Sequence, residues 1–146
     1  MTSWQEFATQ APELADFGKT RFQSGVAYLG TLRADGGPRV HPVTPILGEQ
    51  LFLFMEPTSP KGKDLQRDPR YAMHCAVADM EGGEGEFYVR GFAELTDDPD
   101  LRAQAAAAAS YPPEDRYILF TLSIEFAFMK IYTENESKRL RWQSPK

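Results

Sequence analysis

Residues 25–55 read GVAYLGTLRADGGPRVHPVTPILGEQLFLFM, and this stretch decides the fold class. It holds three β-rich segments with only short turns between them, and Asp35–Gly37 is a strong hairpin signal. Parallel strands need a crossover of about a dozen residues or more, so these segments are predicted to pair antiparallel. Pro42 and Pro45 remove backbone donors and indicate an edge or irregular strand. The three segments are Gly25–Ala34, Pro38–Leu47 and Leu51–Met55.

The flanking sequence adds helices and more strands. Ser3 and Glu6 have the spacing of a capping box, and Ala105–Ala109 favours a helix. Helices are expected over residues 3–11, 12–22, 61–67 and 98–109, strands over 71–78, 86–95, 117–124 and 127–133, and a loop over 80–85. We therefore predict one domain, residues 1–146, that is mainly β: an antiparallel barrel of six or seven short strands with helices packed outside.

Composition excludes several classes of protein. The chain has 146 residues, is 42% hydrophobic and 25% charged, and carries a net charge of −5. The apolar content is too high for a disordered chain, and no stretch approaches the ~20 apolar residues of a membrane span. The acidic balance argues against general nucleic-acid binding. A single cysteine and no visible signal peptide lead us to expect a cytoplasmic protein.

Common catalytic motifs are missing. Residues 18–20 (Gly-Lys-Thr) match the end of a phosphate-binding loop, but Glu13 stands where that loop needs its first glycine. No Gly-x-Ser-x-Gly nucleophile elbow and no dinucleotide fingerprint is present. His41 and His74 form no zinc motif, so no metal site is predicted. Cys75 alternates with apolar residues and is predicted to be a buried core thiol. No catalytic side chain is assigned.

One segment suits an anion. Residues 58–65 read TSPKGKDL, so the Ser59 hydroxyl, two lysines and the first amides of a helix lie close together. A helix N-terminus carries about half a positive charge and exposed N–H donors. Ser59, Lys61 and Lys63 are therefore candidate phosphate-binding residues. The alternative is a capped helix on the solvated surface.

A second candidate segment lies on the strand after the hairpin turn. Arg39, His41 and Val43 occupy alternate positions of that strand and so share one face. A guanidinium and a ring nitrogen on one face can hold the polar end of an anionic aromatic ligand. The alternative is ordinary surface polarity beside a turn.

Together these segments resemble the pyridoxamine 5′-phosphate oxidase-like proteins, the FMN-binding split barrels. The similarity follows the element order from about Trp4 to Trp142. The Asp-Gly-x-Pro start of the second strand is similar to the family's flavin-contacting strand. The Ser59-x-Lys61-Gly62-Lys63-x-Leu65 segment is similar to its phosphate loop.

The resemblance implies a six-stranded antiparallel, Greek-key split barrel that forms a homodimer, with the flavin at the interface and a small-molecule substrate. It implies that a flavin, rather than a protein nucleophile, carries out hydride transfer. The cofactor is expected to be FMN, with a deazaflavin coenzyme as the alternative. The implied cofactor-binding residues are Arg39, His41, Val43, Thr44, Ser59, Lys61, Lys63, Arg141 and Trp142.

The sequence departs from the oxidase itself at two places. Pro60 stands where the oxidase has arginine, and the tail around Arg141 lacks the oxidase's histidine. Pyridoxamine phosphate oxidation is therefore not the expected reaction, and an oxidoreductase with another small substrate is expected instead. Two alternatives stay open: a non-catalytic flavin-binding stress-response protein, and a haem-binding barrel with His41 or His74 as axial ligand.

Overall fold

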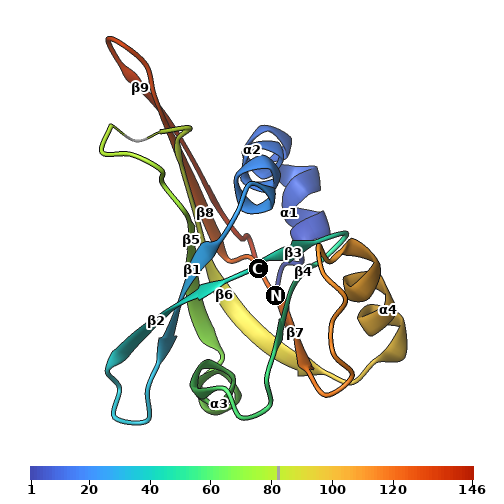
Figure 1. Ribbon diagram of the computed structural model, residues 1–146. Helices are drawn as coiled ribbons and strands as arrows, with labels where there is room; N and C mark the ends of the chain where they lie inside the picture. The colour runs from blue at the N-terminus through green and yellow to red at the C-terminus, as the bar shows by residue number, and fades with distance from the viewer. Residues whose placement is uncertain (82) are drawn as a thin grey trace.

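The computed structural model describes residues 1–81 and 83–146, which form a curled antiparallel sheet flanked by helices (Figure 1). The loop predicted over residues 80–85 includes Gly82, which lies outside the described residues. No helix in the described ranges has the length and apolar content needed to cross a bilayer. The helices are α1 (Trp4–Gln10), α2 (Pro12–Gln23), α3 (Pro60–Arg67) and α4 (Pro99–Ala108). The strands are β1 (Ala27–Leu32), β2 (Pro38–Val43), β3 (Ile46–Leu47), β4 (Leu51–Met55), β5 (Arg70–Cys75), β6 (Glu86–Thr96), β7 (Ile118–Leu122), β8 (Phe126–Tyr132) and β9 (Ser137–Gln143).

The strands form two groups that share β6. One group has the order β2-β1-β5-β6-β8-β9, and the other has the order β6-β7-β4-β3. Every pairing is antiparallel, as predicted for the first strands of the chain from the short turns between them. The predicted split barrel with peripheral helices is confirmed. With β3 and β9 included, the described part of the chain has nine strands rather than six.

The two groups meet at Gly91, in the middle of β6. The edge of β6 that faces away from β5 pairs with β8 up to Arg90 and with β7 from Ala93 onward. Between β7 and β8 the chain crosses Gly91, and a Cβ added there would lie 2.1 Å from the carbonyl oxygen of Ser123. The Ser123 amide donates to the Phe92 carbonyl at 2.8 Å, and the Phe92 amide donates to the Ser123 hydroxyl at 3.0 Å. Glycine is needed here because the two backbones touch.

Helices close the core on two sides. α1 and α2 lie over an aromatic cluster in which Phe87 is fully buried, with ring centroids 5.0 Å from Phe22 and 6.2 Å from Trp4. The predicted capping box is present at the start of α1, since Ser3 and Glu6 exchange hydrogen bonds with each other's backbone amides. α4 covers a second, smaller cluster, which consists of Ile46, Phe52, Phe54, Ala105 and Leu119.

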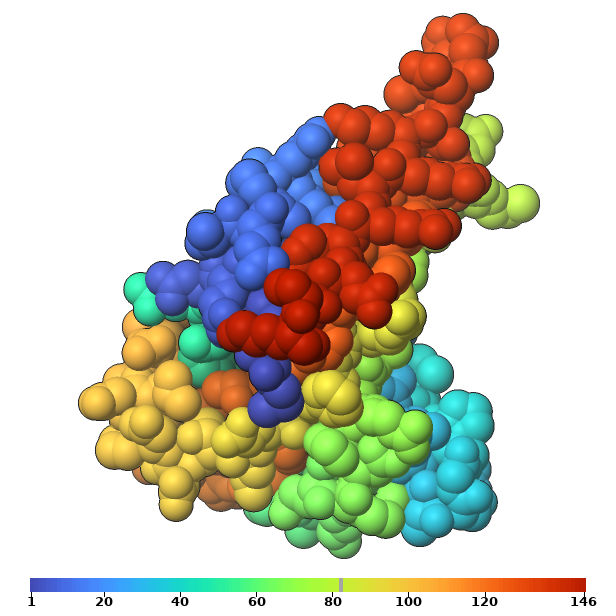
Figure 2. Space-filling view, turned by 180° about the vertical axis from the view of Figure 1, so that it is seen from behind, coloured from blue at the N-terminus to red at the C-terminus, as the bar shows by residue number. Residues whose placement is uncertain are grey.

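The tail differs most from the sequence-based expectation. No strand is predicted after residue 133, but Ser137–Gln143 forms β9 and pairs along all of β8. Its side chains are mostly exposed, so the hydrophobic alternation that identifies strands is weak. Figure 2 shows this C-terminal segment lying against the N-terminal helices. The predicted strand Pro38–Leu47 is interrupted after Val43, where Pro45 prevents regular pairing, and divides into β2 and β3.

Substitution of Gly91 by alanine is expected to destabilise the protein. The new methyl group collides with the Ser123 carbonyl, and moving either backbone breaks the pairing of β6, so we expect a loss of about 1–3 kcal/mol or more. The measurement is urea unfolding followed by circular dichroism. Gly25→Ala is the matched control, because a methyl group there has no atom within 4 Å. Equal midpoints for the two variants would contradict this account of the junction.

Candidate functional site

The candidate site lies where the start of α3 faces the inner side of β2. Ser59 precedes α3 as its N-cap residue, and Pro60 occupies the first turn, which suits a helix start. Gly62 lets the helix approach the sheet: a Cβ there would lie 3.0 Å from the Met55 sulfur and 3.5 Å from Ile118. The first turn of α3 is therefore held firmly against β4 and β7.

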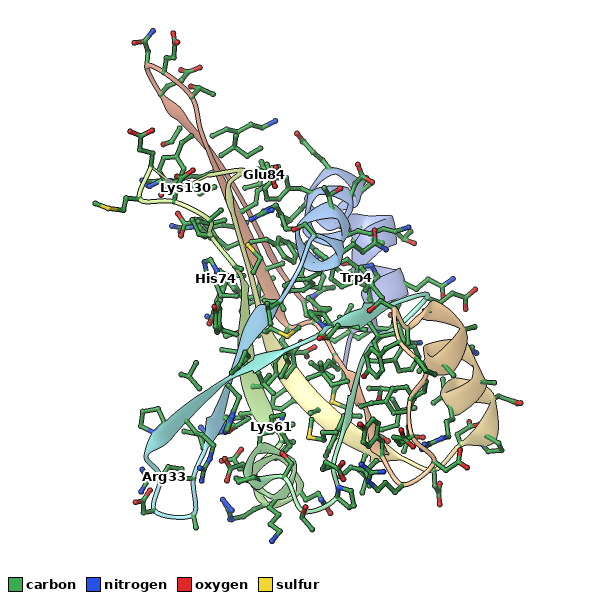
Figure 3. All side chains as sticks on the ribbon, viewed as in Figure 1. Trp4, Arg33, Lys61, His74, Glu84 and Lys130 are labelled. Carbon is green, nitrogen blue, oxygen red and sulfur yellow. The ribbon has the colours of Figure 1, made fainter. Side chains whose placement is uncertain are left out.

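Lys61 is a half-buried ammonium at this helix start (Figure 3). Its Nζ donates to the Ser59 hydroxyl at 3.1 Å, and it makes no ion pair within the described residues. Ser59 is buried, and its side chain makes no capping bond to the helix. Burial lowers the pKa of Lys61, because desolvation disfavours the charged form. A partly buried ammonium group that has no carboxylate partner favours the binding of a negatively charged ligand.

His41 faces the same space from β2. Its Nε2 atom is buried and has no hydrogen-bond partner among the residues that the structure describes. Burial, and after it the charges of Lys61 and Arg39, lower the pKa of His41, so the ring is neutral at pH 7. A buried nitrogen without a partner costs free energy unless a ligand or water satisfies it.

Arg39 completes this group, and its position depends on Asp64. Its Nε donates to the Asp64 carboxylate at 2.7 Å. The same carboxylate accepts from the Thr31 hydroxyl at 2.8 Å and from Arg67 at 3.3 Å. Burial alone would raise the pKa of Asp64, but the bonds from Thr31 and Arg39 hold the pKa below its usual value. Four predicted residues, Arg39, His41, Ser59 and Lys61, thus gather around one helix start.

Asp64 and Thr31 are functional candidates that sequence reasoning missed. Asp64 lies within the quoted segment, three residues after Lys61 and so on the same helical face. Thr31 alternates with the buried residues Ala27 and Leu29 along β1, which places its hydroxyl on the inner side of the sheet. The sequence signal that could have identified Asp64 is its position one helical turn after the candidate cation Lys61.

The other predicted residues lie outside this group. Val43 is buried and packs in the core, while Thr44 lies just beyond β2 and lines a cavity of about 480 Å³. Lys63 is exposed on α3, and its side chain makes no hydrogen bond or ion pair with another described residue. Arg141 is exposed, with its guanidinium 5.9 Å from the ring centroid of Phe128.

Trp142 packs within its own chain. Its ring lies 4.9 Å from Phe7, and its Nε1 donates to Gln10 at 3.2 Å. Binding of the flavin by Arg141 and Trp142 stays a prediction.

His74 differs from His41 in its charge state. It lies on β5, away from Lys61 (Figure 3), and its Nδ1 contacts the Cys75 carbonyl at 2.6 Å. Hydrogen bonding to Cys75, with the nearby Glu86 carboxylate, raises the pKa of His74 to about 9. Cys75 is buried in the core, as its alternation pattern predicts. Among residues 1–81 and 83–146 no three His, Cys, Asp or Glu side chains are grouped to hold a metal ion.

The stability of the protein is expected to fall as pH rises through the folded-state pKa of His74. The folded pKa is raised to about 9 from about 6.5 when unfolded, so the stabilising contribution is complete below pH 6.5 and lost toward pH 9. We expect His74→Gln to flatten this fall in the free energy of unfolding, measured by urea titration across that range. His41→Gln is the control and should leave the slope unchanged, because His41 is already neutral there. Identical pH profiles for His74→Gln and the wild type would refute the assignment.

Comparisons with solved structures show the same fold. A haem-binding protein from Mycobacterium smegmatis aligns with a TM-score of 0.64 at 19% identity, over 85% of this chain and 57% of that one. A candidate pyridoxamine 5′-phosphate oxidase from Lactobacillus delbrueckii aligns at 0.57 and 23% identity, over 74% and 87%. An F420 reductase aligns at 0.56 and 19% identity, over 73% and 91%. This chain therefore spans little more than half of the mycobacterial protein, and these identities are low enough to show the fold alone.

The family assignment comes from the sequence itself. No curated protein matches it, but a family model described as pyridoxamine 5′-phosphate oxidase matches residues 12–134. This match covers both halves of the barrel and α3, with the cationic group at its start. The chain belongs to the pyridoxamine 5′-phosphate oxidase family.

Proposed function

We propose that this protein binds FMN and acts as a flavin-dependent oxidoreductase on a small substrate. The observation that carries the proposal is the group at the start of α3. Lys61 is half buried with only a serine hydroxyl as its partner, and the buried Nε2 of His41 has none among the described residues. Family membership makes a phosphorylated flavin the ligand that this group suits best.

These residues fit a phosphate for three reasons. Lys61 supplies a charge with several donors, Ser59 supplies a hydroxyl, and the first amides of α3 add a positive dipole end. His41 in one of its two neutral tautomers carries a proton on Nε2 and can donate it. The chain as a whole is acidic, so this local group, rather than general charge, would attract the anion.

The flavin ring is assigned to the other end of β2. Val43 and Thr44 follow His41 along the strand, and about 3.3 Å per residue places Thr44 about 10 Å further on. Thr44 lines the cavity of about 480 Å³, together with Phe22 and Val26. When bound, the flavin supplies the redox chemistry, and the protein binds and orients it.

Replacing Lys61 by alanine is expected to weaken FMN binding about 10- to 100-fold, because a charge-assisted hydrogen bond contributes roughly 1.5–3 kcal/mol. Riboflavin, which lacks the phosphate, should bind both proteins equally. The measurement is quenching of flavin fluorescence on titration with protein. Lys19→Ala, an exposed lysine on α2, removes the same charge outside the group at the start of α3 and serves as control. Equal losses for FMN and riboflavin would show that the phosphate lies elsewhere.

The absorbance spectrum of the purified protein separates the alternatives. A flavin spectrum retained through desalting supports the proposal, and a deazaflavin is tested in the same way. Haem is the other candidate, and the site favours His41 over His74 as its axial ligand. Iron binds a neutral imidazole. His41 is neutral at pH 7, and its Nε2 has no partner among the described residues, whereas His74 is protonated. If the wild type shows a Soret band and His41→Ala loses it, the protein binds haem through His41 and the flavin proposal is wrong.

We further infer that a second copy of the chain covers the outer face of the six-stranded group. No helix lies on this face in the described part of the chain, and Val40 and Tyr28 are exposed there to 67% and 47%. Arg90 lies over the ring of Phe126 at 4.2 Å. Arginines interspersed with aromatic rings suit a twofold interface, where the same patch faces itself. One cross-strand row of this face is Pro42, Tyr28, His74, Tyr88, Phe128 and Arg141.

The wild-type protein is accordingly expected to have about twice the 16.5 kDa mass of one chain in multi-angle light scattering. Phe128→Glu places a charge in the apolar part of the face and should give a folded monomer, since the side chain is only partly buried. Gln5→Glu on α1 adds the same charge outside the face and should remain dimeric. A monomeric wild type that retains flavin would rule out a shared site.

A further inference from the structure

We propose that Asp64 is the positioning residue of the cationic site: it holds the Arg39 guanidinium by one nitrogen so that its other two nitrogens face the bound anion. This inference rests on the proposed function, because it assigns a role within the same site. The residue assigned to this anion-binding site, Asp64, is itself negatively charged.

The carboxylate of Asp64 is held from three directions. It is only 1% exposed, and a buried carboxylate is tolerated only when it is paired and hydrogen-bonded. Oδ2 accepts from Thr31 at 2.8 Å and from Arg39 Nε at 2.7 Å, and Oδ1 accepts from the two terminal nitrogens of Arg67 at 3.3 and 3.4 Å. The carboxylate therefore has one defined orientation.

The contact with Arg39 is one-sided. Only Nε of this guanidinium bonds to Asp64, and its two terminal nitrogens have no hydrogen-bond partner in the part of the chain that the structure describes. The side chain is 31% exposed, so these nitrogens remain accessible. A guanidinium is planar, and fixing Nε also fixes the direction of the other two nitrogens.

The free end of Arg39 belongs to the candidate phosphate site. Lys61 lies one helical turn before Asp64, and the charges of Lys61, Arg39 and Asp64 all act on His41. Arg67, by contrast, lies at the far end of α3 and also donates to the Leu32 carbonyl at 3.2 Å. The two arginines thus share Asp64, but Arg39 is the one beside Lys61 and His41.

Preorganisation explains why a carboxylate helps an anion site. An unrestrained arginine loses rotamer freedom when it grips a ligand, and a side chain already held avoids that entropic cost. Arg67 offsets the charge of the carboxylate, so Asp64 orients Arg39 without leaving an uncompensated negative charge in the site.

The test compares Asp64→Asn with wild type for FMN, inorganic phosphate and riboflavin. Asparagine keeps the shape and one acceptor oxygen but loses the charge-assisted bond to Arg39. We expect FMN and phosphate binding to weaken about tenfold and riboflavin binding to stay unchanged, since riboflavin carries no anion. If Asp64 acted only as a repulsive charge, its removal would strengthen FMN binding, and the proposal would be wrong. Asp68→Asn, a half-buried carboxylate four residues later that bonds Arg70 instead of Arg39, is the matched control.

A double-mutant cycle separates positioning from general structural support. In an Arg39→Ala background, Asp64→Asn should have little further effect on FMN, because the side chain that it orients is gone. An undiminished tenfold loss in that background would overturn the proposal. If Asp64→Asn does not fold by circular dichroism, Thr31→Val replaces it: this variant removes one donor to the carboxylate, and a selective two- to fivefold loss of FMN is expected, while no loss overturns the inference.

A second readout does not depend on binding. The Asp64 carboxylate raises the pKa of His41 against the effect of Lys61 and Arg39, so Asp64→Asn should lower this pKa in an NMR titration of the apoprotein. A folded variant with an unchanged His41 titration contradicts the proposed arrangement. If the wild type binds neither FMN nor phosphate, both the proposed function and this inference are wrong. If the wild type binds both ligands and Asp64→Asn binds them equally well, only the inference is wrong.

Discussion

The close approach of two backbones at Gly91 is the constraint on which the rest of the structure depends. β6 has eleven residues and serves both groups of strands, so its outer edge must change partner in the middle. The change is made where Ser123 crosses Gly91, and Tyr71 from β5 donates its hydroxyl to the Ser123 carbonyl at 2.6 Å. The two groups of strands therefore separate at this point of β6.

The candidate site at the start of α3 is a local group of positively charged side chains on an acidic protein. Asp64 offsets only part of the charge of Arg39 and Arg67, and Lys61 beside them is a half-buried cation without an ionic partner in the described residues. Partial burial strengthens the attraction of the site for an anion, because the Lys61 ammonium and the His41 ring are less well hydrated there. Affinity for an anion then depends on burial and orientation more than on the number of charges.

The sequence predicted those parts of the fold that have local physical causes. The Asp35–Gly37 turn, the Ser3 cap and the alternation around Cys75 each depend on neighbouring residues, and the structure has all three features. β9 was not predicted because it is held mainly by backbone pairing with β8. Most of its side chains are exposed, so its sequence lacks the hydrophobic alternation that identifies a strand. The division of β6 at Gly91 escaped as well, because a glycine within a strand signals a close contact without saying with what. In the site, candidate cations were recognisable by type, but the link between Asp64 and Arg39 joins residues 25 positions apart and needed the structure.

The contact between the tail and α1 has a consequence for how the chain folds. Trp142 packs on Phe7 and bonds to Gln10, 132 positions away in sequence, and the Ile124 amide donates to the Thr2 carbonyl at 2.7 Å. A ribosome releases Trp4 and Phe7 long before β8 and β9 exist to complete their packing. During that interval the apolar face of α1 has no finished surface to dock on, and loops this long close slowly. α1 is thus synthesised well before the strands that complete its packing, and it is among the last elements to be secured.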